Sequence, residues 1–397
     1  MKQKKLVLID GNAIIHRAFH AVPEDLSTSS GEPVNATFGF TSMLMKALLE
    51  EKPDYVAVTF DRAAPTFRHA QYVQYKAHRP ALPDNMKPQF ARIREVVQAF
   101  GIQIYEKDGY EADDILGTLS VQATQQGLST VIYTGDMDTL QLVNEHVLIK
   151  VAKRGITEVT EYDAAEVETR YGIPASKLPD FKGLVGDKSD NIPGVPGIGE
   201  KTATRLINEY GDLEGILSHA GQLKAKEQKL LLEYADQARQ SKFLATIVCD
   251  APVQLNVEAC RLLHVDTERV ITLFRQLEFR SLIERALALF RQLGLTSAPG
   301  VDGATEHTVE SASSETLQVA GGEPPEQSGQ PEPPEPSSTA GLENLLFAPP
   351  IGAVPIITPP PPADWDDVAM PARVSASKTD EVTERVTAPA VETPPAV

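Results

Sequence analysis

Cysteine and long apolar runs are scarce in this 397-residue chain. Its two cysteines, Cys249 and Cys260, are too few for a disulfide framework and are not spaced like zinc ligands, which favours a reducing environment. No apolar run approaches the ~18 residues that would cross a bilayer. The N-terminal residues MKQKKLVLID also lack the apolar segment of a signal peptide. We therefore expect a cytoplasmic monomer with no membrane partner.

Positive charge is scarce as well, because 37 Lys and Arg stand against 55 Asp and Glu, a net charge of −18. Taken alone, this balance argues against a protein that binds nucleic acid. The excess is unevenly distributed: residues 295–397 hold 16 acidic and 3 basic side chains, and residues 1–294 hold 39 and 34. The first 294 residues are therefore only mildly acidic, and nine clustered carboxylates more than account for their excess. Nucleic acid remains a possible partner.

These nine carboxylates stand in short clusters, most of them directly after an apolar run that predicts a β-strand. They are Asp10, Asp61, Glu111, Asp113, Asp114, Asp136, Asp138, Asp187 and Asp190. The carboxyl ends of parallel strands open onto one crevice, so we expect these side chains to converge there. Two carboxylates about 4 Å apart repel by roughly 4 kcal/mol at an effective dielectric near 20, so the cluster needs protons or cations. Oxygen-only ligands point to Mg²⁺ or Mn²⁺.

A simpler explanation exists for each carboxylate group taken alone. Asp10 and Asp61 follow strands, where an acidic residue often caps the next helix. Glu111, Asp113 and Asp114 open a helical pattern, where negative charge suits the helix dipole. Three carboxylates in four positions nevertheless exceed what capping requires. Five groups at strand ends or in loops favour a functional site.

Residues 1–180 alternate strand-like runs with helical patterns at 13–21, 38–51, 86–100 and 112–126. This alternation predicts an α/β fold with a doubly wound, mostly parallel sheet flanked by helices. Residues 181–295 read as helical, with patterns at 201–210, 226–241 and 270–290. From residue 296 to 397 the chain is rich in Pro, Gly, Ser, Thr and Glu, and we expect a disordered tail or linker.

The segment 62–86 interrupts the α/β pattern with basic and aromatic residues. Its prolines limit any helix, and so long an excursion in a compact domain is usually functional or mobile. Lys76 and Arg79 are three apart and would share one helix face beside Tyr75. We expect these cations to steer a phosphate toward the carboxylates, and Tyr75 to stack on a base. A solvated surface remains the alternative for Arg62 and His78.

A second candidate for phosphate binding is the run PGVPGIGEKTA at residues 193–203. Gly197 and Gly199 precede a helical pattern that carries Lys201 and Thr202 in its first turn. Backbone N–H groups in such a hairpin can approach a phosphate. The alternative is an ordinary tight turn between two helices.

Five ordered motifs resemble the 5′-nuclease domain at the N-terminus of bacterial DNA polymerase I, a member of the flap endonuclease superfamily. They are LIDGNAIIHRAFHA, FDRAAPTFRHAQYVQYKAHR, GYEADDILGTL, YTGDMDTLQL and GLVGDKSDNIPGVPGIGEKTA. The resemblance covers about residues 4–290. It implies a PIN-like nuclease core, a helical arch over the active site, and a helix-hairpin-helix element that grips duplex DNA. It also implies two or more divalent ions.

The resemblance further implies roles for individual residues. Asp10, Asp61, Glu111 and Asp113 would form a first metal site, and the other five carboxylates would complete it or form a second. The basic active-site contacts would be Lys76, Arg79, Arg17 and Arg68, and the hairpin residues Gly197, Gly199, Lys201 and Thr202 would contact DNA.

The function implied is a divalent-metal-dependent, structure-specific 5′-3′ exonuclease and flap endonuclease. It would hydrolyse phosphodiesters at DNA flaps, nicks and 5′ ends in primer removal and repair. Three alternatives stay open. The chain could be an N-terminal fragment of a longer polymerase I, a catalytically silent DNA-binding module, or a phosphatase with an aspartate nucleophile. The last would need a second acid where Asn12 stands.

One short apolar run, LENLLF at residues 342–347, stands out in the acidic, proline-rich tail. Isolated apolar clusters in disordered segments are often docking motifs. A sliding clamp or a polymerase is the partner we consider for it. An incidental cluster in a linker, or the edge of a further domain, is the simpler explanation.

Overall fold

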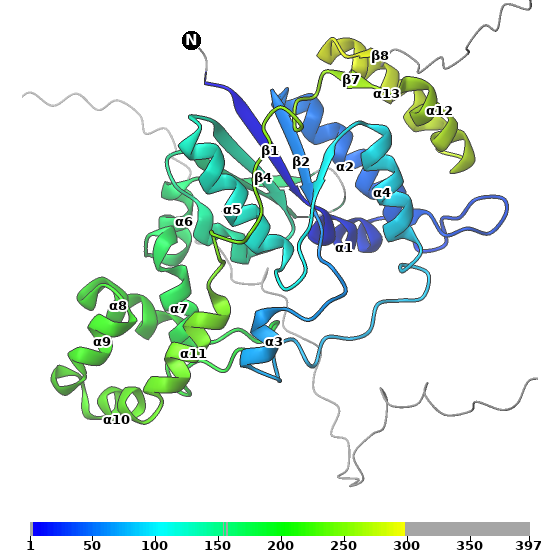
Figure 1. Ribbon diagram of the computed structural model, residues 1–397. Helices are drawn as coiled ribbons and strands as arrows, with labels where there is room; N and C mark the ends of the chain where they lie inside the picture. The colour runs from blue at the N-terminus through cyan, green and yellow to red at the C-terminus, as the bar shows by residue number, and fades with distance from the viewer. Residues whose placement is uncertain (1–2, 154, 156–157, 298–397) are drawn as a thin grey trace, which may run out of the picture. The chain divides into compact units, whose positions relative to one another are not determined.

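A six-stranded sheet lies at the centre of the computed structural model, which describes residues 3–153, 155 and 158–297 (Figure 1). Its strands are β1 (Lys5–Asp10), β2 (Tyr55–Thr59), β3 (Gln103–Tyr105), β4 (Ser129–Thr134), β5 (Val147–Ala152) and β6 (Val159–Tyr162). The strand order is β3-β2-β1-β4-β5-β6, and only the last pair, β5 with β6, is antiparallel within the described sheet. The order reverses direction between β1 and β4, so the crevice expected for a ligand opens beyond the carboxyl ends of these two strands.

Each face of the sheet is covered by helices, as the alternation in the sequence predicts. In β1, Val7 and Ile9 pack into one apolar core, whereas Leu6 and Leu8 pack into another. The first core contains α1 (Gly11–Ala21), α2 (Asn35–Glu51) and α4 (Gln89–Ala99), and the second contains α5 (Ala112–Gln125) and α6 (Ala164–Tyr171). The predicted α/β class and its four helical patterns are therefore confirmed.

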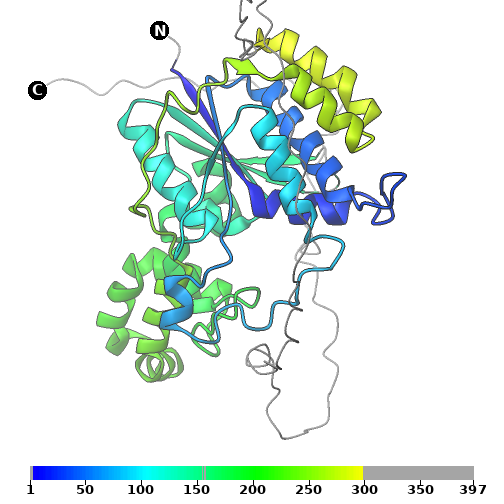
Figure 2. The same ribbon diagram turned by 45° about the vertical axis from the view of Figure 1, so that its right-hand side comes forward.

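The segment 62–86 differs from the helical arch that the resemblance implies. Among its residues only Phe67–Gln71 form a helix, α3, and the remainder consists of turns and extended chain. Figures 1 and 2 show it as a long loop interrupted by α3. Three prolines explain the difference, because each removes a backbone N–H donor from any helix that would include it.

The helical region begins with α7 (Leu178–Val185) and α8 (Glu200–Tyr210), which pack against each other. It continues with α9 (Leu213–Ser218), α10 (Ala225–Glu233) and α11 (Ala235–Ala245). The pattern at 226–241 was expected as one helix but forms two, because Tyr234 between α10 and α11 has a non-helical backbone with φ −111° and ψ 20°. Short 3-10 turns, η1 (Met137–Leu142), η2 (Ala175–Lys177) and η3 (Ala220–Gln222), complete the connections.

The last two helices correct the expected extent of the helical subdomain, 181–295. They are α12 (Thr267–Gln276) and α13 (Arg280–Leu293), separated by Glu278, whose φ of 60° ends helical geometry. Both belong to the first core of the sheet, where α12 packs against α4 and α13 against α2. The division at residue 180 otherwise stays a prediction.

A short parallel pair, β7 (His264–Val265) with β8 (Thr296–Ser297), closes the described chain. Two residues that we assigned to the tail, Thr296 and Ser297, therefore belong to a strand. The rest of the predicted tail, including LENLLF, lies outside the described residues. None of the helices within the described ranges is long and apolar enough to span a membrane.

Candidate functional site

A cavity of about 540 Å³ opens beyond the carboxyl ends of β1 and β4, where the sheet topology predicts it. Five of the nine predicted metal ligands line it: Asp10, Asp61, Glu111, Asp113 and Asp136. Five side chains that are or can become cationic line it too: His16, Arg17, His20, Lys76 and Arg79. The cavity therefore has one acidic and one basic wall.

Asp10 is held in place by the start of α1. Its carboxylate caps the helix by accepting a hydrogen bond from the N–H of Ala13 at 3.0 Å, and it accepts another from the Thr134 hydroxyl at 2.7 Å. The capping role that we considered as the simpler explanation is thus real, but it uses only part of the acceptor capacity of the carboxylate. Asp10 is 3% exposed. Asp10 therefore both caps α1 and lines the cavity.

Asp61 and Glu111 meet at the start of α5. The Asp61 carboxylate accepts from the N–H of Ala112 at 2.7 Å, and Glu111 is the N-cap residue of the helix. Asp113 follows in the first turn and lines the same cavity. Strand β2 and helix α5 thereby bring three carboxylates together.

Asp114 does not reach the cavity, so its assignment as a metal ligand was wrong. It is fully buried and forms a two-pronged ion pair with Arg68, with both N···O distances at 2.7 Å. Its oxygens also accept from the backbone N–H groups of Glu111 and Val248. Each oxygen of Asp114 thus already accepts two hydrogen bonds from the protein and has no lone pair left for a metal ion.

Arg68 does not line the cavity either, although its Nη1 lies 3.7 Å from Oε2 of Glu111, which does. Its side chain is 3% exposed, and its Nε and Nη2 donate to the carbonyl oxygens of Leu244 and Thr246 at 2.9 and 2.7 Å. Together with the pair to Asp114, these bonds tie α3 to α5 and to the end of α11. These contacts are structural, and a direct contact of Arg68 with DNA stays a prediction.

Asp138 and Asp187 form a separate acidic pair around a lysine that the sequence reading missed. Lys182 Nζ lies 2.5 Å from Asp187 Oδ2 and also contacts Asp138 Oδ1. Burial opposes the charge on Lys182, but both carboxylates raise its pKa. Burial also opposes ionisation of Asp187, but Lys182 and Ser189 together lower the pKa of that carboxyl to about 2. An ammonium group thus occupies the position between two predicted metal ligands.

The loop after α3 places Lys76 and Arg79 at the cavity without a helix. Lys76 has a left-handed backbone, φ 54°, which is uncommon for a side chain that carries a Cβ, and its N–H donates to the carbonyl of Asp190 at 3.0 Å. Its Nζ lies 2.9 Å from Glu111 Oε2 and 3.7 Å from Asp190 Oδ2. Arg79 pairs with the other oxygen of Asp190. Asp190 therefore anchors this loop and does not line the cavity.

Tyr75 cannot stack on a DNA base as we predicted, because it is 3% exposed. Its hydroxyl donates to Glu111 at 3.1 Å or to Asp190 at 3.2 Å. Burial, followed by the charges of these two carboxylates, raises its pKa. The residue orients carboxylates and packs the loop.

Burial, and after it the repulsion between neighbouring carboxylates, raises the pKa values of several of these acids. Burial raises the pKa of Asp10 to about 7, and the charges of Asp61 and Asp136 add to the rise. Burial and then Asp10 and Asp136 raise the pKa of Asp113 well above its ordinary value. Burial also raises the pKa of Asp138 to about 7, with Asp136 as the next cause. A bound cation would offset this cost.

The donor set fits a hard divalent ion by its chemistry, since only carboxylate oxygens converge in the acidic wall. The side chains are not already arranged as a closed ligand shell. Within the described part of the chain, no three Asp, Glu, His or Cys side chains lie close enough to hold one ion as they stand. Lys76 contacts Glu111, and Lys182 lies between Asp138 and Asp187. Lysine side chains of the protein therefore already pair with some of the carboxylates that we predicted as metal ligands.

The predicted hairpin joins α7 to α8. Gly194 and Gly197 have φ values of 62° and 89°, and a Cβ on Gly194 would lie 2.2 Å from the backbone nitrogen of Gly186. Gly199 is the N-cap of α8 with an ordinary φ, and Lys201 is exposed in the first turn, with Thr202 beside it. Two packed helices joined by a glycine-containing turn agree with the expected element, while its identity as a helix-hairpin-helix and its contact with DNA stay predictions.

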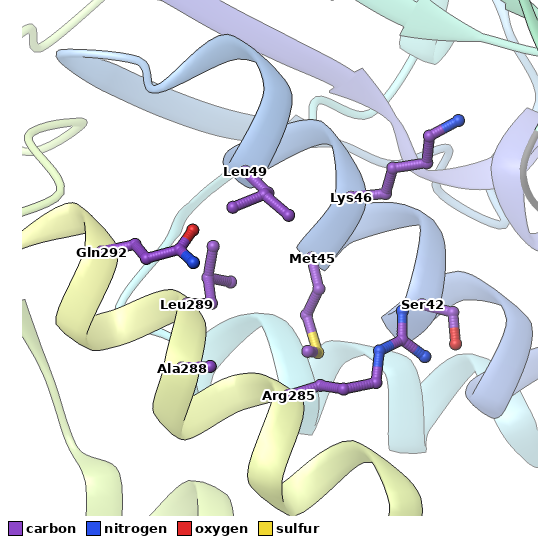
Figure 3. A pocket seen from close by; sticks show the side chains of 8 residues that line it. All are labelled: Ser42, Met45, Lys46, Leu49, Arg285, Ala288, Leu289 and Gln292. Carbon is purple, nitrogen blue, oxygen red and sulfur yellow. The ribbon is translucent and has the colours of Figure 1, made fainter.

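A second cavity, of about 250 Å³, lies between α2 and α13 (Figure 3). Its walls include Met45, Leu49 and Leu289, with Lys46 and Arg285 at the sides. It contains no carboxylate, cysteine or histidine, so it lacks the side chains that hydrolysis would need.

Family models match most of the described chain. The N-terminal resolvase-like domain of the 5′-3′ exonuclease matches residues 5–172, and its C-terminal SAM fold matches residues 173–268. DNA polymerase I of Caldicellulosiruptor bescii is 46% identical over 283 residues, 71% of this chain and 33% of that protein. DNA polymerase I of Chloroflexus aurantiacus is 50% identical over 278 residues, 69% and 29%. The chain thus spans about a third of the length of these relatives.

Solved structures share the fold at low identity. A T5 5′-exonuclease with bound zinc gives a TM-score of 0.51 at 20% identity, covering 62% of this chain and 90% of that chain. A T5 flap endonuclease complex with DNA and metal ions gives 0.52 at 16% identity, covering 73% and 100%. These likenesses confirm the predicted architecture of a mostly parallel sheet with an added helical part.

Proposed function

Because this chain belongs to the 5′-3′ exonuclease family, we propose that it is a divalent-metal-dependent 5′-nuclease acting on branched or 5′-ended duplex DNA. The observation that carries the proposal is the convergence of five carboxylates and five basic side chains on one cavity. The bound metal and DNA in the T5 structures support the choice of metal and substrate by analogy of fold.

The residues proposed to hold the first metal ion are Asp10, Asp61, Glu111, Asp113 and Asp136, with Mg²⁺ or Mn²⁺ as the expected ion. When bound, such ions supply a water of lowered pKa and positive charge for the oxygens of the reacting phosphate. Asp138 and Asp187 are the proposed ligands of a second ion, in place of Lys182. Asp190 and Asp114 are better explained as anchors of the loop and of α5.

The basic side chains of the cavity have a separate task. Lys76 and Arg79 reach the cavity from the loop after α3 and can bind the non-bridging oxygens of the scissile phosphate, where negative charge develops. Lys76 shares Glu111 with the proposed ligand set, which fixes its ammonium next to the reacting group. Burial opposes this charge, but Glu111 and Asp190 raise the pKa of Lys76, so it stays protonated at neutral pH.

The helix-hairpin-helix element is proposed to hold the duplex on which the nuclease acts. Gly197, Gly199, Lys201 and Thr202 would contact backbone phosphates, which positions DNA without reading its sequence. Flaps, nicks and 5′ ends are the proposed substrates, in primer removal and repair. A cytoplasmic, monomeric state and a clamp or polymerase partner for the tail are also proposals.

Two alternatives are disfavoured by specific contacts. A phosphatase with an aspartate nucleophile needs a second acid two residues after Asp10, but Asn12 stands there and its Oδ1 accepts from the N–H of Asp61 at 3.1 Å. A silent DNA-binding module would have no reason to keep buried acids with raised pKa values. A chain that is part of a longer polymerase I agrees with the coverage of the relatives and leaves the nuclease proposal unchanged.

The decisive experiment incubates the protein with a 5′-labelled flap DNA in Mg²⁺, Mn²⁺ or EDTA. Cleavage near the flap junction is expected with either metal and not with EDTA. Asp113→Ala should abolish cleavage but leave DNA binding within a few-fold, since the change removes negative charge that faces the phosphates. Glu145→Gln, in an exposed turn, is the control. Binding without cleavage in every metal would support the silent module.

A further inference from the structure

The cavity between α2 and α13 is a groove that both helices line in the same way (Figure 3). Its lining residues run from Ser42 to Leu49 on α2 and from Arg285 to Gln292 on α13, in each helix at the spacing i, i+3, i+4 and i+7. This spacing marks one stripe of a helix surface, which at 1.5 Å per residue is about 10 Å long. A partly apolar stripe of this kind ordinarily packs against a further helix.

The floor of the groove is apolar and reaches the solvent. Met45 and Leu289 are 8% and 3% exposed, and Leu49 beside them is 41% exposed. Figure 3 shows these three side chains in the space between the two helices. The groove therefore offers continuous apolar surface that a partner would remove from water.

A polar group without a partner lies at one end of this groove. Ser42 is 3% exposed, and its buried Oγ has no hydrogen-bond partner among the described residues. A serine in a helix can donate to the carbonyl four residues before it, but Ser42 does not make this bond. A hydroxyl offers one donor and two acceptor sites, so a ligand that hydrogen-bonds at this point would satisfy it.

The same end of the groove carries a positive charge. Figure 3 shows Arg285 extending from α13 toward Ser42. Arg285 has no ion-pair partner within the described ranges, and no Asp or Glu side chain lines the groove there. Lys46, on the wall formed by α2, adds a second cation, which lies 3.5 Å from Glu50. A carboxylate is the group that accepts from both a hydroxyl and a guanidinium.

The groove lies toward the other end of the sheet from the acidic cavity. Glu51 follows two residues after Leu49, and its carboxylate pairs with Lys5, the first residue of β1, at 2.7 Å. Strand β1 is about 20 Å long, and its last residue, Asp10, lines the cavity. A ligand in the groove would therefore leave the cavity free for DNA.

We propose that this groove binds an acidic amphipathic helix of a partner protein. Apolar side chains of that helix pack on Met45, Leu49 and Leu289, and one of its carboxylates accepts from Ser42 and Arg285. The length of the groove suits a helix that anchors at i, i+3, i+4 and i+7. An extended segment fits less well, because helical walls have no free backbone groups to pair with those of a strand. This docking site does not depend on the proposed nuclease activity.

The experiment places the photo-crosslinking residue p-benzoylphenylalanine at Gln292 of the full chain, in the cells that make the protein. Gln292 is exposed at the rim of the groove. Crosslinked segments are sequenced by mass spectrometry, and a synthetic peptide copy of the segment is titrated into the purified protein. We expect a segment of another protein that is acidic and has apolar side chains at helical spacing. The control carries the crosslinker at Glu145, in an exposed turn.

Substitutions then test the individual contacts. Arg285→Glu should bind the peptide about tenfold more weakly, the scale of a charge-assisted hydrogen bond. Ser42→Ala should also weaken binding but should not lower the melting temperature, because it removes a hydroxyl that has no partner. Arg291→Glu makes the same charge change on α13 outside the groove and should leave binding unaltered.

Three results would each overturn the proposal. The first is a crosslink yield at Gln292 no higher than that at Glu145. The second is crosslinking to another copy of this chain or to its own residues 298–397 instead of a partner. The third is a peptide that binds Arg285→Glu as tightly as the wild type.

Discussion

Raising the pH without divalent ions should destabilise the folded protein, because its buried acids resist ionisation. Asp10 and Asp138 both have a pKa of about 7 in the fold against an ordinary 3.8. Between these two values the folded chain binds more protons than the unfolded chain. Stability therefore falls as the pH rises through this window. Asp187, whose pKa is lowered to about 2, loses its contribution only in acid below pH ~4.

The size of the effect follows from the shift on Asp10. One pKa unit corresponds to about 1.4 kcal/mol. From pH 5 to pH 8 the unfolded carboxyl is already ionised while the folded one becomes so, and linkage gives a loss of about 2–3 kcal/mol for one independent group. For a domain of this size that lowers the melting temperature by on the order of 5–10 °C. His16 acts in the opposite direction, because its pKa is lowered in the fold.

Melting temperatures between pH 5 and pH 8 in EDTA test this expectation. Asp10→Asn removes one titrating group, so its melting temperature should fall less across the range than that of the wild type. Glu145→Gln, which changes an exposed carboxylate, should leave the dependence unaltered. Mn²⁺ or Mg²⁺ should flatten the fall in the wild type, since ions that bind the ionised acids stabilise the fold. A wild type and an Asp10→Asn variant with identical pH dependence would refute the reasoning.

Three further substitutions probe the cations of the site. Lys76→Ala should slow single-turnover cleavage about a hundredfold, the scale of an interaction worth ~3 kcal/mol in the transition state, with a smaller change in DNA affinity; equal losses would make it a plain DNA contact. Lys182→Met should lower the melting temperature in EDTA and enlarge the stabilisation by Mn²⁺, because Asp138 and Asp187 would lose their counter-ion; an unchanged response to Mn²⁺ would exclude a metal at that pair. Lys201→Ala should weaken duplex binding and reduce its salt dependence without moving the cleavage position; unaltered binding to a duplex without a flap would remove the hairpin from the interface.

Strand ends were predictable from sequence because a buried parallel strand is a continuous apolar run. Asp10 and Asp61 follow such runs, and the structure brings both to the predicted crevice. The sequence pattern does not show which way each side chain at the start of a helix faces. Asp113 and Asp114 are adjacent at the start of α5, about 100° apart around its axis. One faces the cavity and the other faces Arg68 in the interior.

The sequence pattern could not predict hydrogen-bond and ion-pair partners that come from distant segments of the chain. Arg68 finds its carbonyl acceptors 176 and 178 residues later in the chain, in a segment that carries no acidic signal. Lys182 lies on α7, five residues before Asp187, which follows the end of that helix, and a helical lysine is ordinarily a solvated one. Amphipathic patterning likewise shows that α12 and α13 bury one face, but not which core receives it.

The central claim is that the acidic wall binds divalent ions and cleaves DNA with them. The most direct measurement is a single-turnover assay of the whole chain on a 5′-labelled flap DNA, with Mg²⁺ titrated from zero and Asp113→Ala run in parallel. The account predicts no cleavage without metal, saturable cleavage near the junction with Mg²⁺, and none in the variant. Cleavage that persists in EDTA, or full activity of Asp113→Ala, would contradict it.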